Sequence, residues 1–301
     1  MTRVGIIILP QLRWAQQAEL WRRAEAYGFD HAWTYDHLTW DPTAGQPWGA
    51  TLPTLAAAAG VTSRIALGTW VASPNYRHPV PFARELAGLD DVSGGRAVLG
   101  IGAGGTGRDA VVLGVEALSP TDRAARLEEF VTLLDLILIQ PSTTWRGRFY
   151  AATDAETTLP CLQPPRLPFV VAANGPRTMR LAARFGRGWA TTGDPAVGRD
   201  HGDQAWWAGV ERMAERFDQV LAEQGRDPGS IDRLLSVDAA PTFSLVSAAY
   251  FGEVLDRAAG LGFTDVVTHW PIPGGAVYSG REDVLDQIAG RLAGPVSGGA
   301  G

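Results

Sequence analysis

Short apolar runs alternate with longer amphipathic stretches along almost the whole chain. The apolar runs lack the polar alternation of a half-exposed strand, which is the pattern expected of parallel strands covered on both faces. Each run is followed by a stretch with apolar residues at helical spacing, most clearly in residues 122–138. One face of that stretch carries Leu127, Phe130, Val131, Leu134 and Ile137.

Eight such strand-then-helix units follow one another without a long linker. This order favours a closed (βα)8 TIM barrel over an open doubly wound sheet, with one domain over residues 1–294. Residues 140–168 break the pattern, so we expect an insertion there, with a hairpin near 144–150, over the barrel mouth. We expect residues 295–301 to be a disordered tail. The predicted strands are 4–9, 31–35, 64–70, 96–101, 168–173, 188–192, 234–239 and 264–270.

Asp36 and His37 follow the second predicted strand, in the stretch WTYDHLTW that ends at Trp40. Active sites of such barrels lie at the carboxyl ends of the strands, where these residues fall. A histidine titrates near neutral pH, and a neighbouring carboxylate favours its charged form. The pair is therefore a candidate acid/base site. The alternative is a loop in which Asp36 makes a turn and His37 is solvated.

Three further loops at strand ends contain candidate ligand-binding residues. Residues 100–109, GIGAGGTGRD, contain five glycines that allow a ligand to approach the backbone closely. In residues 172–186, Gly175 and Pro176 precede a helix whose free amides could bind phosphate, with Arg177 adding charge. A tight turn and ordinary helix capping explain the same residues structurally. Residues 68–79 join the third strand to its helix.

Composition removes several classes of function. The 26 basic residues are all arginine, which excludes a Schiff-base lysine and a Walker-type phosphate loop. Cys161 is the only cysteine, so an intrachain disulfide and a thiolate zinc site are excluded. A net charge of −6 without a basic cluster argues against nucleic acid, and no apolar run is long enough to span a membrane. These observations favour the cytoplasm.

Four segments together resemble the luciferase-like monooxygenase superfamily, barrel enzymes that use FMN or the deazaflavin F420. They occur in the family's order, and the similarity extends from residue 1 to about residue 290. The segments are FDHAWTYDHLTW, the run RIALGTWVASPNYRHPVPFARELAGLDDVSGGR, LGIGAGG, and RLPFVVAANGPRTMRLAARFGRGW. The resemblance implies a flavin-type oxidoreductase acting on a small organic molecule.

The resemblance also implies roles for individual residues. Asp36 matches an acid beside the deazaflavin's central ring, His37 a base or proton relay, and Trp40 an aromatic that steadies the transition state. The Trp70–Val71 bond falls where the family has a non-prolyl cis peptide behind the ring. The other residues implied to contact the cofactor are Ala72, Ser73, Gly102, Ala103, Gly104, Ala173, Asn174, Gly175, Pro176, Arg177 and Thr178.

The chain also departs from one branch of this family. F420-dependent sugar-phosphate dehydrogenases carry a glutamate in the fourth-strand loop and lysines for the substrate's phosphate. Here the loop reads Gly104-Gly105-Thr106 and lysine is absent, so we do not expect that activity. Asp109 could replace the acid or simply cap the following helix. His269 and Trp270, after the last strand, are candidates for the substrate pocket, and an internal hydrogen-bonded histidine is the alternative for His269.

The sequence is compatible with three classes of function. F420-dependent hydride transfer is slightly favoured over oxygenation with FMN reduced by a separate enzyme. A metal-dependent hydrolase would use Asp36, His37, Asp238 and His269, although such sites usually need more histidines or a modified lysine. A non-catalytic binding barrel is the third class. The family resemblance further implies a homodimer, for which the apolar helix at 80–92 is a candidate surface.

Overall fold

The computed structural model describes residues 2–43 and 45–292, and the tail predicted at 295–301 lies outside these residues. Eight parallel strands form a closed barrel in the order β1-β10-β9-β8-β7-β4-β3-β2, which confirms the predicted (βα)8 fold. The barrel strands are β1 (Arg3–Ile7), β2 (His31–Thr34), β3 (Ala66–Thr69), β4 (Ala97–Ile101), β7 (Phe169–Ala172), β8 (Gly188–Thr191), β9 (Asp232–Ser236) and β10 (Asp265–His269).

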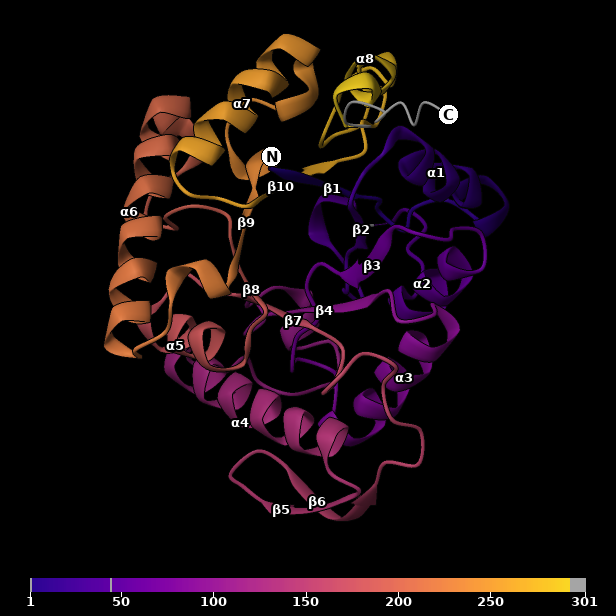
Figure 1. The fold of residues 1–301 in the computed structure, drawn as a ribbon, viewed down its shortest axis with the longest axis vertical. Helices are drawn as coiled ribbons and strands as arrows, with labels where there is room; N and C mark the ends of the chain where they lie inside the picture. The colour runs from indigo at the N-terminus through magenta and orange to yellow at the C-terminus, as the bar shows by residue number, and fades with distance from the viewer. Residues whose placement is uncertain (1, 44, 293–301) are drawn as a thin grey trace, which may run out of the picture.

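Figure 1 shows the helices arranged around the outside of the strands. Within the described ranges, no helix is both long and apolar enough to cross a membrane. The long helices are α1 (Trp14–Tyr27), α2 (Thr51–Ala59), α3 (Pro79–Val92), α4 (Pro120–Ile139), α5 (Pro176–Phe185), α6 (Gly202–Glu223), α7 (Ala248–Gly260) and α8 (Asp283–Leu292).

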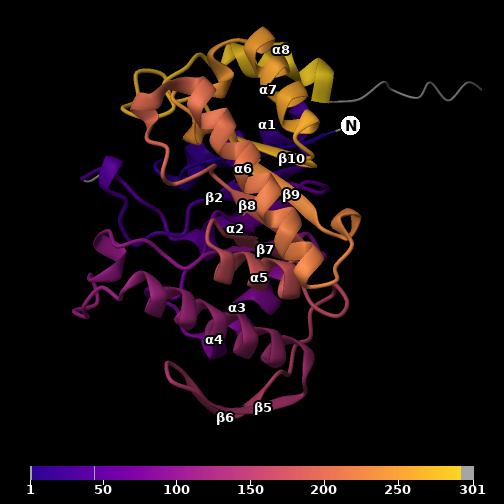
Figure 2. The same cartoon turned by 90° about the vertical axis from the view of Figure 1, so that its left-hand side faces the viewer.

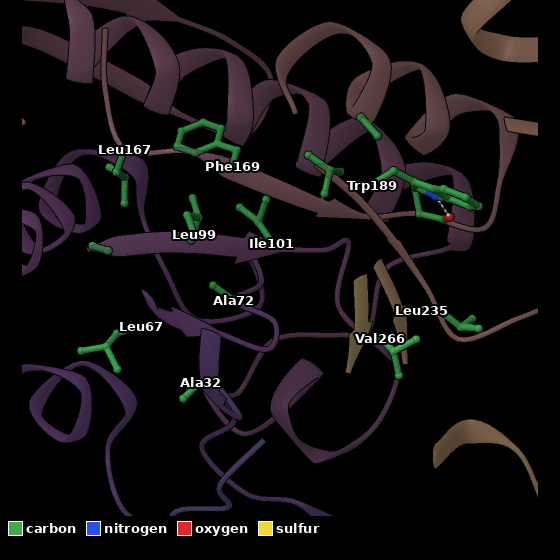
Figure 3. Close-up of a cluster of buried hydrophobic side chains, with 14 of the residues drawn as sticks. Ala32, Leu67, Ala72, Leu99, Ile101, Leu167, Phe169, Trp189, Leu235 and Val266 are labelled. Carbon is green, nitrogen blue, oxygen red and sulfur yellow. Dashed lines mark hydrogen bonds between the residues drawn. The ribbon is translucent and has the colours of Figure 1, made fainter. Parts of the chain in front are cut away.

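Two apolar layers hold the barrel together, one outside and one inside the ring of strands. The outer layer packs strands against helices, and part of it, including Leu99, Phe169 and Trp189, is shown in Figure 3. Because both layers are apolar, the strands need the near-continuous hydrophobic sequence from which they were predicted. The inner layer consists of Ile7, Leu9, Trp33, Trp70, Val170, Ala190, Leu234 and Val267.

A polar network lies at the amino-terminal end of the barrel. Asp265 accepts hydrogen bonds from Arg3 at 2.8 and 2.7 Å, and one of its oxygens lies 3.0 Å from His31 Nε2. Burial by itself would raise the pKa of Asp265, but the hydrogen bonds from His31 and Arg3 outweigh burial and lower it to about 2. Trp33 donates to His31 Nδ1 at 2.6 Å. These side chains join β1, β2 and β10 at the end away from the candidate site.

The inserted segment forms the predicted hairpin, but the prediction that it lies over the barrel mouth was wrong. Strands β5 (Ser142–Arg146) and β6 (Ala151–Glu156) pair antiparallel and lie outside α4, as Figures 1 and 2 show. The Glu129 carboxylate of α4 accepts hydrogen bonds from the backbone amides of Arg148, Phe149 and Tyr150. In a (βα)8 barrel, the helices form the outer ring, so the hairpin that follows α4 packs on the outside of that ring.

Candidate active site

A cavity of about 470 Å³ opens at the carboxyl ends of β2, β3, β4, β7 and β8. Its volume lies within the ~300–1,000 Å³ typical of small-molecule and cofactor sites. Five different loops contribute to it, as expected for the active-site face of this fold. The cavity is lined by His37, Thr39, Trp40, Asp41, Pro42, Trp70, Val71, Ser73, Asn75, Gly102, Ala103, Gly104, Gly105, Gly107, Arg108, Asp109, Ala172, Ala173, Asn174, Ala190, Thr191 and Thr192.

His37 lies in the cavity wall and is held by Asp109. His37 Nδ1 is 2.6 Å from Asp109 Oδ2, and Asp109 Oδ1 accepts from the amides of Leu38 and Thr39, both at 3.0 Å. The Asp109 side chain is 8% exposed and that of His37 35% exposed. An ionised carboxylate can only accept, so Nδ1 carries the hydrogen. This leaves His37 Nε2 as the ring nitrogen available to a ligand.

Asp36 was predicted to lie beside a cofactor ring, and the structure places its carboxylate behind the cavity wall. Its carboxylate is buried against Arg77, which donates to both oxygens at 2.6 Å, and Asp36 does not line the cavity. His37 lines the cavity and Asp36 does not, so the two side chains do not share a surface. The Arg77 guanidinium also lies 4.3 Å from the centre of the Phe82 ring. Asp36 therefore anchors its loop to the segment before α3.

Trp40, for which contact with a cofactor ring was predicted, lines the cavity and lies among other aromatics. Its ring meets Tyr35 edge-on at 5.1 Å and is stacked with Tyr278 at 6.3 Å between centroids. Trp48 lies 5.8 Å from Trp40 and donates from Nε1 to the carbonyl of His37 at 2.9 Å. Trp40 is therefore held on the cavity side of a packed aromatic cluster.

The peptide bond between Trp70 and Val71 is cis, as predicted, and both residues line the cavity. Ser73, two residues on, also lines it, whereas Ala72 is fully buried behind the wall. The Ala72 amide donates to the carbonyl of Gly100 at 2.8 Å, and its carbonyl accepts from Gly102 at 2.9 Å. This backbone pairing extends β4 by one step and fixes the wall.

The glycine-rich loop after β4 forms the neighbouring part of the cavity wall. A Cβ added at Gly102 would lie 3.1 Å from a Val71 methyl, close enough to force a shift. Gly104 has φ +77°, and a Cβ there would come within 2.7 Å of the Asn75 side chain. The backbone conformation therefore favours glycine at 104, and a side chain at 102 would require Val71 to move by a few tenths of an ångström. Gly102, Ala103 and Gly104, which were predicted to contact a cofactor, line the cavity.

The segment between β7 and α5 reaches the cavity wall, whereas the first residues of α5 do not line it. Ala173 and Asn174 line the cavity, and Asn174 Oδ1 accepts from Thr191 Oγ1 at 2.7 Å. The predicted phosphate contacts that follow, Gly175, Pro176, Arg177 and Thr178, are not among the lining residues. Arg177 instead pairs with Glu128 at 2.6 Å, and its side chain is 45% exposed.

Trp270 was predicted to line a substrate pocket, and the structure contradicts this. Its ring is buried on the outside of the barrel, stacked on Tyr27 of α1 at 6.3 Å. The Arg23 guanidinium lies 5.0 Å from the centre of the Trp270 ring. Trp270 follows a residue that points into the barrel, so its own side chain faces the helices.

His269 lies inside the barrel and does not reach the cavity wall, which also corrects its predicted place. His269 Nδ1 is 2.9 Å from Asp238 Oδ2, Nε2 is 2.8 Å from the Tyr35 hydroxyl, and that hydroxyl is 2.9 Å from the Tyr278 hydroxyl. The Tyr278 ring stacks on His269 at 3.5 Å. Tyr35 and Tyr278, together with Trp40, separate His269 from the cavity.

The pKa values in this network define the hydrogen-bond directions. Burial lowers the pKa of His269, so the ring is neutral near pH 7. Burial alone would raise the pKa of Asp238, but the hydrogen bonds from His269 and Ser244 lower it. Burial also raises the pKa of Tyr35. His269 Nδ1 therefore donates to ionised Asp238, and Nε2 accepts from Tyr35.

The four residues of the metal-hydrolase hypothesis do not meet in one place. Asp36 pairs with Arg77 and His37 with Asp109, whereas Asp238 and His269 bind each other inside the barrel. Across residues 2–43 and 45–292, no group of three or more His, Cys, Asp or Glu side chains is arranged to hold a metal ion.

Residues 2–242 match the family described as luciferase-like monooxygenase. The chain belongs to the luciferase-like monooxygenase family. Among curated proteins it is 32% identical over 218 residues to an F420-dependent glucose-6-phosphate dehydrogenase of Microbacterium testaceum, covering 71% of this chain and 60% of that one. It is 30% identical to an F420-dependent hydroxymycolic acid dehydrogenase of Mycobacterium tuberculosis, covering 70% of this chain and 54% of that one. The matched region thus spans about three fifths of these relatives or less.

Solved structures share the fold of this luciferase-like chain at low sequence identity. An F420-dependent secondary alcohol dehydrogenase in complex with an F420-acetone adduct aligns with a TM-score of 0.79 at 17% identity, covering 97% of this chain and 99% of that one. The coenzyme F420-dependent tetrahydromethanopterin reductase of Methanopyrus kandleri aligns with a TM-score of 0.75 at 19% identity, covering 96% and 97%. Both likenesses bear on the fold alone.

Two contacts of this luciferase-like site could not be predicted from local sequence. Asp109 was considered as a replacement acid or a helix cap, but its pairing with His37 joins loops 72 residues apart. Arg77 occurs in the loop that carries the resemblance, yet nothing there indicates that it binds Asp36 across 41 residues. The one sequence signal for Asp109 was its position after the fourth strand, and for Arg77 its position in the loop after the third strand.

Proposed function

We propose that this luciferase-like protein is an F420-dependent oxidoreductase that transfers hydride to or from a small organic substrate. The observation that carries the proposal is His37, fixed by Asp109 in the wall of a cavity backed by the cis Trp70–Val71 peptide. The F420-dependent relatives support the choice of cofactor.

The residues present fit a flat tricyclic group. The cavity has sufficient volume, and glycines at 102 and 104 keep its wall free of side chains that would project into it. When bound, a deazaflavin supplies the hydride chemistry, and the protein orients the reactants and excludes water. Trp70, Val71 and Ala103 would support the ring, and Trp40 would shield it.

His37 would hold or move the proton that accompanies hydride transfer. Its Nε2 is the free ring nitrogen on the cavity side, because Nδ1 is committed to Asp109. Asp109 is then a positioning residue, and it stabilises the charged imidazole when His37 takes up a proton. Asp36 supports this arrangement only indirectly, through Arg77 and the loop before α3.

The substrate differs from glucose 6-phosphate in this proposal, despite the names of several relatives. The chain has no lysine to bind a sugar phosphate, and Gly104-Gly105-Thr106 occupies the loop where that branch carries its glutamate. An aldehyde, ketone, imine or activated alkene of modest size is the class that a single proton-transfer group could serve.

A reduced-FMN monooxygenase is the second candidate, favoured by the description of the family itself. In that case a separate reductase would supply the reduced FMN. The proposal has three further parts. Residues 175–178 contact the cofactor's phosphate, two copies of the chain form a homodimer through α3, and the protein is located in the cytoplasm.

Equilibrium titration with F420 and with FMN, each oxidised and reduced, tests the cofactor directly by fluorescence. We expect tighter binding of F420 and its loss in Gly102→Val, because a branched side chain there would collide with Val71 and fill the wall. Gly88→Ala is the matched control, since a Cβ at Gly88 meets nothing within 4 Å and Gly88 lies outside the cavity. Preference for reduced FMN would support the monooxygenase instead. Binding of neither cofactor would overturn both.

A further inference from the structure

A second cavity of about 420 Å³ lies on the outer side of the first, between the starts of α3 and α4. Asn75 lines both cavities, and it accepts a hydrogen bond from the Arg126 guanidinium of α4. The second cavity is lined by Pro74, Asn75, Tyr76, Arg77, His78, Leu113, Val115, Glu116, Leu118, Arg126, Phe149 and Tyr150.

Two polar groups in this cavity are buried without a hydrogen-bond partner among the described residues. They are Arg126 Nε and the hydroxyl of Tyr150, a residue only 8% exposed. Buried donors are nearly always satisfied in folded proteins, and each orphan donor costs free energy. Both groups therefore lack an acceptor, and a ligand that reaches the cavity could supply it.

The charges around the cavity favour an anion. Within residues 2–43 and 45–292, Arg126 forms no ion pair, whereas the charge of Arg77 is matched by Asp36 and Glu85. Glu116 is the one carboxylate in the lining, and it is exposed. Burial lowers the pKa of Arg126, the direction expected of a cation removed from water without a counterion.

The remaining lining residues complete a site for an amphipathic anion. His78 Nδ1 accepts from the Val80 amide at 3.3 Å, so its other nitrogen carries the hydrogen when the ring is neutral. Burial raises the pKa of Tyr150, which keeps the phenol a donor. Leu113 and Val115 are 60% and 53% exposed, and they add an apolar wall next to these donors.

We propose that this second cavity is an anion subsite, in which Arg126 and Tyr150 bind a carboxylate or phosphate group. The apolar chain that carries the anion lies against Leu113 and Val115. Because Asn75 lines both cavities, they lie next to each other, and the proposed ligand extends from one to the other with its reacting part in the first. The anion belongs either to the side chain of the cofactor or to the substrate. The assignment of the anion to the cofactor rests on the proposed function, whereas the anion subsite itself does not.

Calorimetric titration with inorganic phosphate and with acetate tests the anion site in the protein alone. We expect Arg126→Gln to lower the affinity by about tenfold or more, the size expected for one charge-assisted hydrogen bond. Arg84→Gln is the matched control, because Arg84 is an exposed arginine on α3 that lines neither cavity. Absence of binding to the native chain, or equal binding by Arg126→Gln, would overturn the proposal.

Tyr150→Phe separates a ligand site from a structural role. The Tyr150 hydroxyl has no partner among the described residues, so its removal should leave the melting temperature unchanged or raise it, while the anion affinity falls severalfold. A lower melting temperature with unchanged anion affinity would count against the proposal, because the hydroxyl would then be serving the fold.

Titration with F420 and with its chromophore stripped of the anionic side chain identifies the source of the anion. If Arg126→Gln weakens binding of F420 but not of the stripped chromophore, the anion is part of the cofactor. If both chromophores bind as before while phosphate still requires Arg126, the anion belongs to the substrate. If neither binds the native chain, the proposed function fails, and the phosphate and acetate titrations still decide this subsite.

Discussion

The substitution Asp109→Asn tests whether a tertiary contact sets the protonation of His37. In the native chain the carboxylate accepts from His37 Nδ1 at 2.6 Å and from two backbone amides, of Leu38 and Thr39, at 3.0 Å. An amide side chain can keep the two backbone bonds through its oxygen, and it then turns its NH2 group toward His37. Nδ1 must become the acceptor, so the proton of the neutral ring moves to Nε2, on the cavity side.

The cost in stability follows from the same contacts. Loss of one charge-assisted hydrogen bond, with a His37 side chain that is 35% exposed, should lower the free energy of unfolding by about 1–2 kcal/mol. Asp109→Ala also leaves the amides of Leu38 and Thr39 without an acceptor, so we expect about 2–4 kcal/mol. Urea unfolding measures both values, and Asp91→Asn, an exposed position at the far end of α3, should change neither.

Nitrogen NMR of histidine-labelled protein reads the tautomer directly, since the chain has only 5 histidines and His37→Gln assigns the signal. We expect Nδ1–H in the native protein and Nε2–H in Asp109→Asn. Turnover with a bound cofactor should fall about tenfold to a hundredfold, because the ring presents the wrong nitrogen to the ligand. An unchanged tautomer together with unchanged turnover would refute this account of the pair.

Three further predictions concern the frame around the site. The pKa of Asp265 is lowered from 3.8 to about 2, so its contribution of about 2 kcal/mol is present above pH 4 and lost as the pH falls toward 2; urea unfolding of Asp265→Asn should lack that pH-dependent loss. Glu129→Gln should weaken the bonds to the hairpin amides and speed hydrogen exchange at residues 148–150, and unchanged exchange would contradict this. Trp270→Phe should destabilise the fold by about 1–3 kcal/mol without altering cofactor affinity, and a weaker affinity would return Trp270 to the binding site.

The fold could be predicted from sequence because its determinants are local and repeated. Each strand must be apolar on both faces to pack against helices outside and side chains inside, and this requirement is visible in every apolar run. The wall of the cavity was also predictable in part. At Gly102 and Gly104 a side chain would meet Val71 and Asn75, so glycines in this loop indicate a closely packed wall. The family resemblance located the cis peptide at Trp70–Val71.

The partners of the candidate catalytic residues were decided by tertiary structure. The neighbouring residues Asp36 and His37 suggested an acid/base pair, but in the structure Asp36 binds Arg77 and His37 binds Asp109. Trp270 likewise found its partner in another segment, since its ring stacks on Tyr27 of α1.

The hairpin and the second cavity depend on how whole elements pack. The inserted hairpin packs on the outer face of α4. This packing places Tyr150 in the lining of the second cavity, together with Arg126. Sequence alone thus determined the barrel, the edge on which its candidate site lies and the glycine wall, since each depends on local pattern. Which carboxylate serves His37, and where buried donors lack partners, depended on distances between segments far apart in the chain, which only the folded structure sets.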